Sequence, residues 1–192
     1  FQEKKWIDII IKILKALIYS AFLLHTVGLI IRWIISGHAP WSNGYESMIY
    51  IAWATLLSGV LFSRRSSLTL VATTIVSSLI LMVAHLNWLD PEITNLVPVL
   101  KSYWLMIHVA IITASYGFLA LGAMLGLFGL WLIFLYNFTN NKKLELVCDE
   151  ITIINEKSLI IGLYMLTIGT FLGGIWANES WGRYWGWDPK ET

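Results

Sequence analysis

Flat aromatic rings and charges are interleaved in one short stretch near the end of the chain, WGRYWGWDPKET. Trp181, Trp185 and Trp187 supply the rings, and the glycines between them leave room for a bulky ligand to approach closely. The ligand that suits such a stretch is a large planar π-system with acidic groups at its edge, which Arg183 or Lys190 could pair with. A tetrapyrrole has both features.

Tryptophan also gathers at membrane–water boundaries, because its ring is apolar while its N–H group needs water. Eight of the 11 tryptophans lie near one predicted boundary, at Trp33, Trp41, Trp88, Trp104, Trp176, Trp181, Trp185 and Trp187. An interfacial belt explains Trp33, Trp88 and Trp176. Three tryptophans in one short polar loop favour a ligand-binding platform instead.

Iron in a tetrapyrrole takes axial ligands, and histidine is the usual one. His108, in KSYWLMIHVAIITASYG, lies about one turn into a predicted helix, on the side of the tryptophan loop. It is the preferred candidate for the ligand. His38 and His85 fall on the same side, and His25 falls near mid-bilayer, where both a structural and a functional role are open.

The composition predicts an all-α, polytopic membrane helix bundle. The 192 residues are 57% hydrophobic and 13% charged, whereas soluble domains carry about 25% charged residues. A net charge of +1 gives no support for a nucleic-acid partner, and Cys148 is the single cysteine, which excludes an internal disulfide. We expect residues 1–192 to form one membrane domain, a fragment of a longer protein whose C-terminal helices follow.

Five segments are apolar and long enough to be predicted as transmembrane helices. They cover roughly Ile13–Ile35, Met48–Phe62, Leu68–Leu86, Tyr103–Phe138 and Leu159–Trp176. A lysine-bearing lead, KKWIDIIIKILK, is predicted before the first span and could lie along the membrane surface. The connection NFTNNKKLELVCDEITIINEK before the fifth span is predicted to be partly helical.

Basic residues are distributed unequally between the two predicted sides, which predicts a cytoplasmic N-terminus. The predicted inner side holds Lys4, Lys5, Lys12, Lys15, Arg64, Arg65, Lys142, Lys143 and Lys157. The predicted outer side keeps Arg32, Lys101, Arg183 and Lys190. The tryptophan loop is therefore expected on the outer (periplasmic) face.

Three stretches together resemble one known family. WGRYWGWDPKET resembles the tryptophan-rich WWD signature of the haem-handling proteins of cytochrome c biogenesis, and its DPKET continuation is similar to the CcsA (ResC) branch of system II. RWIISGHAPWSNGYES resembles that branch's first outer loop, and LVPVLKSYWLMIHV resembles the segment that bears its first external histidine. The likeness runs from about Leu24 to the end of the chain.

The resemblance implies a cytochrome c assembly factor in the bacterial inner (cytoplasmic) membrane. Such a protein holds b-type, non-covalently bound haem at the outer face and presents it to the CxxCH segment of apocytochrome c. By matching position, His108 would be an axial ligand of the haem iron, and the platform would comprise Trp181, Gly182, Tyr184, Trp185, Gly186, Trp187 and Asp188. A CcsB-like subunit or fused domain would be the partner, and a second external histidine is expected beyond Thr192.

No Ser–His–Asp or Cys–His arrangement indicates a catalytic nucleophile, so we expect haem attachment to be an activity of a complete cytochrome c synthase complex. Two alternatives remain open. A cytochrome b-type electron-transfer subunit would set paired histidines at matching depths on facing helices. A secondary transporter would place interrupted helices at the midplane.

Overall fold

The computed structural model describes residues 2–64, 66–86, 89–93, 103–139 and 141–184, with the side chains of residues 2–5 excepted. Over these residues the chain is helical and contains no strand. The helices are α1 (Gln2–Ser36), α2 (Gly44–Phe62), α3 (Ser67–Ala84), α4 (Tyr103–Thr139) and α5 (Lys142–Trp181). The predicted all-α bundle is confirmed.

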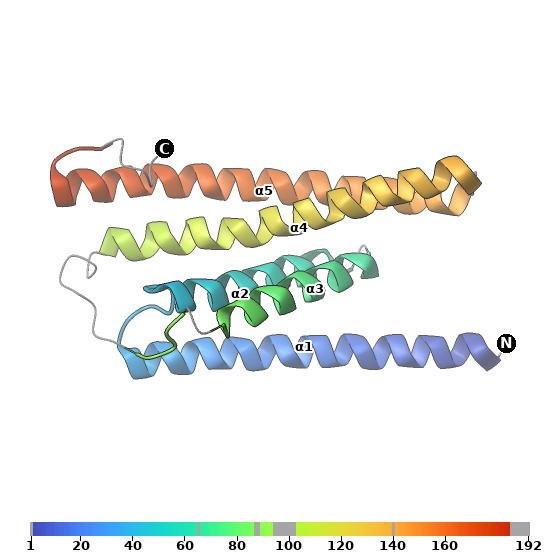
Figure 1. Ribbon diagram of the computed structural model, residues 1–192, viewed down its shortest axis with the longest axis horizontal. Helices are drawn as coiled ribbons and strands as arrows, with labels where there is room; N and C mark the ends of the chain where they lie inside the picture. The colour runs from blue at the N-terminus through green and yellow to red at the C-terminus, as the bar shows by residue number, and fades with distance from the viewer. Residues whose placement is uncertain (1, 65, 87–88, 94–102, 140, 185–192) are drawn as a thin grey trace.

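Consecutive helices run antiparallel, and the bundle has three tiers (Figure 1). α1 lies along one side, α2 and α3 form the middle, and α4 packs with α5 on the other side. The C-terminal ends of α1, α3 and α5 therefore meet the N-terminal ends of α2 and α4 at one end of the molecule, which we call the loop end. Chain direction alone thus brings the loop after α1 and the turn after α5 to the same end.

Four helices, α2 to α5, are long and apolar enough to cross a membrane. Large apolar side chains on the outside of the bundle match this, for example Leu24 in α1 at 72% exposed and Phe171 in α5 at 73% exposed. A lipid environment would cover such side chains without cost. The fifth predicted span, within α1, and the orientation of the bundle stay predictions.

The helix boundaries differ from the predicted ones at two places. The lysine-bearing lead is the first part of α1 and continues into the apolar segment as one helix, not as a separate surface segment. α5 begins at Lys142, capped by Asn141, whose side chain accepts a hydrogen bond from the Lys143 amide at 3.0 Å. The cap stabilises a helix start at Lys142 by satisfying a backbone amide of the first turn. Most of the polar connection is therefore helical.

Glycine lets α4 and α5 approach closely at several points along their shared length. A Cβ atom added at Gly122 would collide with Leu159, and one at Gly169 would collide with Ile112. Next to the Leu159 contact, the Ser158 hydroxyl donates across the pair to the Phe118 carbonyl at 2.7 Å. Small residues and hydroxyl bridges are the usual means by which helices associate in membranes. The two helices thus hold a fixed register up to the loop end.

Candidate functional site

His108, the predicted ligand, lies near the start of α4 and faces α5. Its Nδ1 atom is 3.3 Å from the Gly169 carbonyl oxygen. Because a carbonyl can only accept, this bond places the proton of a neutral imidazole on Nδ1 and leaves the Nε2 lone pair available. Metal-ligating histidines are held in this way, by a carbonyl or carboxylate that fixes the tautomer and orientation of the ring.

Trp176 lies beside this imidazole in a nearly parallel orientation. The two ring centroids are 6.1 Å apart and the ring planes differ by only 10°, so the rings are stacked. Trp176 also contacts Trp181 at the end of α5, with centroids 4.8 Å apart and planes inclined by 66°. The structure therefore brings His108 and the first residue of the predicted platform together through one intervening indole.

The chain reverses after α5 at Gly182. This residue has a φ of 72°, a left-handed conformation that glycine adopts without strain, and its amide donates to the Asn178 carbonyl at 2.8 Å. Tyr184 then lies back against α5, where its carbonyl oxygen would be 3.8 Å from a Cβ added at Gly174. The turn thus directs Arg183 and Tyr184 back alongside the helix.

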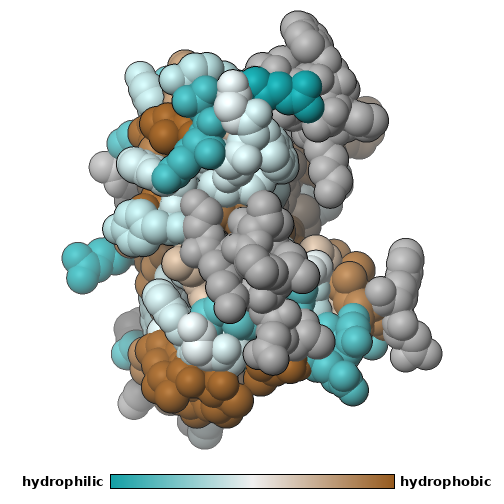
Figure 2. All heavy atoms as spheres, turned by 90° about the vertical axis from the view of Figure 1, so that its left-hand side faces the viewer, coloured by the Kyte–Doolittle hydropathy of each residue, from teal (hydrophilic) through white to brown (hydrophobic). Residues whose placement is uncertain are grey.

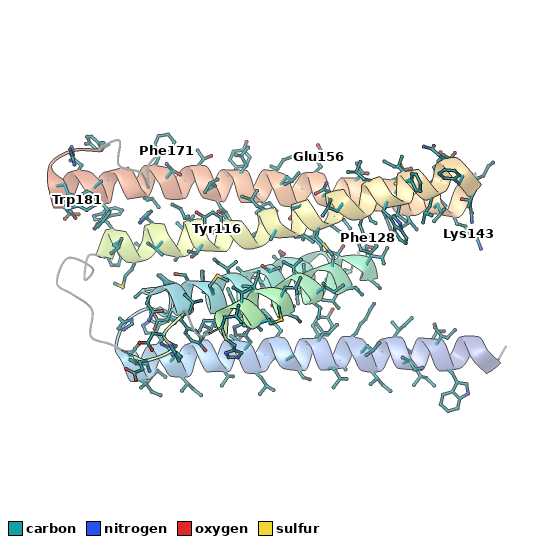
Figure 3. The ribbon with its side chains drawn as sticks, in the orientation of Figure 1. Tyr116, Phe128, Lys143, Glu156, Phe171 and Trp181 are labelled. Atoms are coloured by element: carbon teal, nitrogen blue, oxygen red, sulfur yellow. The ribbon has the colours of Figure 1, made fainter. Side chains whose placement is uncertain are left out.

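Trp181 is 52% exposed and Tyr184 is 64% exposed, so the start of the loop presents aromatic surface outward. In Figure 3, Trp181 marks the loop end of α5, whereas Phe171 points away from α4 on the outer side of the same helix. Arg183 is also exposed. The remaining predicted platform residues lie outside the described residues: Trp185, Gly186, Trp187 and Asp188. Lys190 also lies outside them.

The face of the loop end is mixed in character (Figure 2). Hydrophilic and intermediate residues occupy much of the visible surface on the α5 side, and a hydrophobic patch occupies the lower margin on the α1 side. This pattern suits a membrane boundary, where polar chain ends meet apolar helix sides.

His38 belongs to a largely buried ionic cluster beside α1. Glu46 is fully buried, accepts a hydrogen bond from Arg32 Nε at 2.9 Å and accepts another from the Ser42 amide at 2.9 Å. His38 Nδ1 is 4.0 Å from the same carboxylate and 3.2 Å from the Ala39 carbonyl. We call Arg32, His38 and Glu46 the ionic cluster, and its contacts join the first loop to α1 and α2.

His25 and His85 line a different space, a cavity of about 740 Å³ between α1, α2 and α3. Most of its lining is aliphatic, with Arg32 also present. His25 Nδ1 is buried and has no hydrogen-bond partner among the described residues. In the three-tiered arrangement, α2 and α3 lie between α1 and the α4–α5 pair, so this cavity and His108 are on opposite sides of the middle tier.

The first loop nevertheless reaches the His108 segment through Trp41. Its indole Nε1 donates to the Met106 carbonyl at 3.0 Å, two residues before His108. Trp41 in turn contacts Trp33 and Tyr50, with ring centroids 5.6 Å and 4.8 Å apart. These loop-end tryptophans join helices to one another, which goes beyond the interfacial anchoring that was predicted for Trp33.

Trp176 is the residue that reasoning from the sequence assigned differently. It was predicted as part of an interfacial belt, yet its indole nitrogen is buried and its ring stacks on His108. The signal was present in the spacing of Gly169, Gly173 and Trp176, which at three to four residues apart form one stripe of a helix. That stripe is what faces His108.

The described residues contain no group of three or more His, Cys, Asp or Glu side chains that could hold a bare metal ion. A single oriented imidazole beside aromatic rings suits instead a metal that arrives inside a planar organic ligand. Fold and site together define a polytopic membrane protein with a histidine–tryptophan site at one end of its bundle.

Comparison with known proteins specifies the family. The family model described as "Cytochrome C assembly protein" matches residues 41–192, so the chain belongs to the cytochrome c assembly protein family. This membership places the protein in cytochrome c biogenesis and implies that it handles haem. The predicted relation to the CcsA branch is confirmed by the relatives.

Three relatives illustrate the range of similarity. The chain is 56% identical over 171 residues to "Protein NrfI" of Wolinella succinogenes, covering 89% of this chain and 19% of that protein. It is 34% identical over 218 residues to the cytochrome c biogenesis protein CcsA of Prochlorococcus marinus (strain MIT 9312), covering 100% of this chain and 69% of the relative. With CcsA of Chlamydomonas reinhardtii the identity is 37% over 173 residues, covering 85% of this chain and 48% of the relative. The chain thus spans only part of the length of each relative.

Proposed function

We propose that this protein binds haem at the loop end and presents it for attachment to apocytochrome c. His108 would ligate the iron through Nε2, and Trp181, Gly182 and Tyr184 would begin the platform that continues through Trp185, Gly186, Trp187 and Asp188. The observation that carries the proposal is the contact between His108 Nδ1 and the Gly169 carbonyl, which leaves Nε2 as the free ligand atom.

The residues present fit such a ligand in character. A haem has an apolar disc, which the half-exposed ring of Trp181 could cover, and acidic side groups, which the exposed Arg183 could pair with. The haem would be b-type and bound without a covalent link, as substrate for the attachment reaction. The predicted outer face of the bacterial inner membrane would be the place of this site.

In the attachment reaction, the thiol of each CxxCH cysteine adds across a haem vinyl group, with the sulfur bonding to one vinyl carbon and the proton going to the other. The apocytochrome brings both thiols, so this chain need not supply a nucleophile. It would supply position, which can lower a barrier by roughly 7–11 kcal/mol when reacting groups are held in alignment. A CcsB-like subunit or domain would complete the synthase.

Family membership favours this assembly role over the cytochrome b-type and transporter alternatives. The proposal is tested by replacing His108 with Ala in the full-length protein and recording the haem Soret band after purification in detergent. The band should disappear or weaken at least tenfold, because loss of an axial ligand removes the strongest single contact. His85→Ala is the matched control, since His85 is an exposed histidine at the same end of the bundle. Equal haem content in both variants would overturn the proposal.

A further inference from the structure

We propose that Gly173 and Trp176 of α5 position the imidazole of His108, so that one helix both orients the iron ligand and begins the tryptophan platform. This inference rests on the proposed function, because it treats His108 as the ligand. It assigns positioning roles to two residues of the segment before the platform, neither of which would itself touch the iron.

Gly173 provides the space in which the ring lies. A Cβ atom added there would be 2.8 Å from His108 Nδ1 and 2.9 Å from Cε1, closer than carbon atoms of neighbouring side chains approach. Both contacts are to the edge of the ring that carries the bond to the Gly169 carbonyl. A methyl group at residue 173 must therefore push the imidazole away from this carbonyl or rotate it.

Trp176 fixes the plane of the ring. An axial imidazole stands upright on a haem, with its plane perpendicular to the macrocycle, because its lone pair points along the iron axis. If His108 ligates the iron, an indole that lies within 10° of the imidazole plane would stand on edge to the macrocycle, and Trp176 would not be a stacking surface for it. The indole is instead a wall that restricts rotation of the imidazole.

Trp181 differs from Trp176 in this respect. Its plane is inclined by 66° to that of Trp176, and hence steeply to the imidazole as well. A ring turned in this way can offer its face to a macrocycle that stands across the imidazole. The two neighbouring tryptophans thus have separate tasks: Trp176 orients the ligand, and Trp181 contacts what the ligand binds.

The Gly169 carbonyl completes the arrangement. A hydrogen bond from Nδ1–H to a backbone oxygen makes the opposite nitrogen a stronger donor to a metal, and loss of such a support typically weakens metal binding by about 10- to 100-fold. Gly173 and Trp176 keep the ring within reach of this carbonyl. Their effect on haem should therefore be similar in size to the loss of that bond.

The test compares Gly173→Ala with Gly174→Ala in the full-length protein, using haem titrated into the purified, haem-free protein in detergent. Both changes add one methyl group to α5, but at Gly174 the nearest described atom, the Tyr184 carbonyl oxygen, is at an ordinary 3.8 Å. Gly173→Ala should weaken haem binding roughly 10- to 100-fold and change the g values of the ferric haem in its electron paramagnetic resonance spectrum. Gly174→Ala should leave both close to those of the unaltered protein. Equal affinities and equal g values in the two variants would overturn the inference.

Trp176 provides an independent arm if Gly173→Ala does not fold. Trp176→Phe keeps an aromatic wall, and Trp176→Leu keeps apolar bulk without a flat ring. The leucine variant should change the g values and the midpoint potential of the bound haem. The phenylalanine variant should keep both close to those of the unaltered protein. A leucine variant with unaltered g values and midpoint potential would contradict a positioning role.

The outcomes also separate this inference from the proposed function. If His108→Ala retains its haem, the proposed function fails. A different result would overturn only the positioning roles. In that case His108→Ala loses its haem, whereas Trp176→Leu binds haem with unaltered affinity and spectra, and so does Gly173→Ala where it folds. The ligand assignment then stands.

Discussion

Two histidine-bearing regions meet at the loop end of the bundle, and the surroundings of their histidines differ. In the α4–α5 pair, His108 is held by a backbone carbonyl and a stacked indole, both uncharged, and one ring nitrogen is left for a ligand. In the ionic cluster, His38 lies beside a fully buried carboxylate that Arg32 already neutralises. Both Nδ1 atoms lie beside a backbone carbonyl, so this contact alone does not distinguish the two histidines. They differ in the carboxylate beside His38 and in its Nε2 atom, which is buried without a hydrogen-bond partner among the described residues. We therefore expect His108, and not His38, to be the ligand.

The largest expected change in folding free energy comes from a substitution in the ionic cluster. Glu46→Gln keeps the size of the side chain but removes the charge that balances Arg32 in a buried setting, and breaking a buried pair costs about 3–5 kcal/mol of folding free energy. Thermal or denaturant unfolding in detergent should show this loss. Haem affinity, measured on the protein that remains folded, should be unchanged.

Glu92→Gln is the matched control for this change, because Glu92 is exposed and its substitution should alter the unfolding free energy by no more than about 0.5 kcal/mol. A Glu46→Gln variant that folds as well as this control but loses haem would contradict a structural role for the ionic cluster. It would make the ionic cluster part of the binding site.

A smaller effect is expected where the middle tier meets α4. A Cβ atom added at Gly117 would lie 2.6 Å from the Thr55 amide nitrogen and 2.7 Å from the Ala54 carbonyl carbon, both backbone atoms that cannot move aside alone. Gly117→Ala should therefore destabilise the fold by about 1–3 kcal/mol through overpacking. Because Gly117 is in the same helix as His108, the shift of α4 should also weaken haem binding, but less than Gly173→Ala does.

Gly129→Ala is the control on the same helix, since a Cβ atom there meets no atom within 4 Å. Replacing this helical glycine should stabilise the protein by about 0.5–1 kcal/mol, because alanine loses less backbone entropy on folding. Changes in unfolding free energy of opposite sign in the two variants would show that glycine is required at residue 117 and not at residue 129. Equal losses in both would show that glycine at residue 117 has no packing role.

Much of the fold was predictable from the sequence, because it depends on patterns that lie within one segment. Apolar length identified the helices, and alternating chain direction brought the first loop and the tryptophan stretch to one end. The pairing within α4–α5 was predictable in principle too. His108 and Gly173 are equally far in sequence from the connection near residue 140, and so are Ile112 and Gly169, as an antiparallel hairpin requires.

The parts that were predicted incompletely depend on contacts between segments. Polar residues between Thr139 and Lys157 indicated a connection, yet most of them form the start of α5. The helix begins at Lys142 because the Asn141 side chain caps it there. Trp176 resembles an anchor in the sequence because indole suits both a membrane boundary and a stacked site. Only the position of His108 on the facing helix distinguishes the two roles.

Chemical replacement of the imidazole tests directly whether His108 ligates the iron. His108→Gly removes the imidazole and leaves a space that added imidazole can occupy, whereas His25→Gly removes a histidine on the other side of the middle tier. If His108 ligates the iron, purified His108→Gly protein should bind haem weakly, regain the unaltered Soret and α bands when imidazole is added, and differ in both respects from His25→Gly. A His108→Gly protein that shows the unaltered haem spectrum without added imidazole would contradict the account.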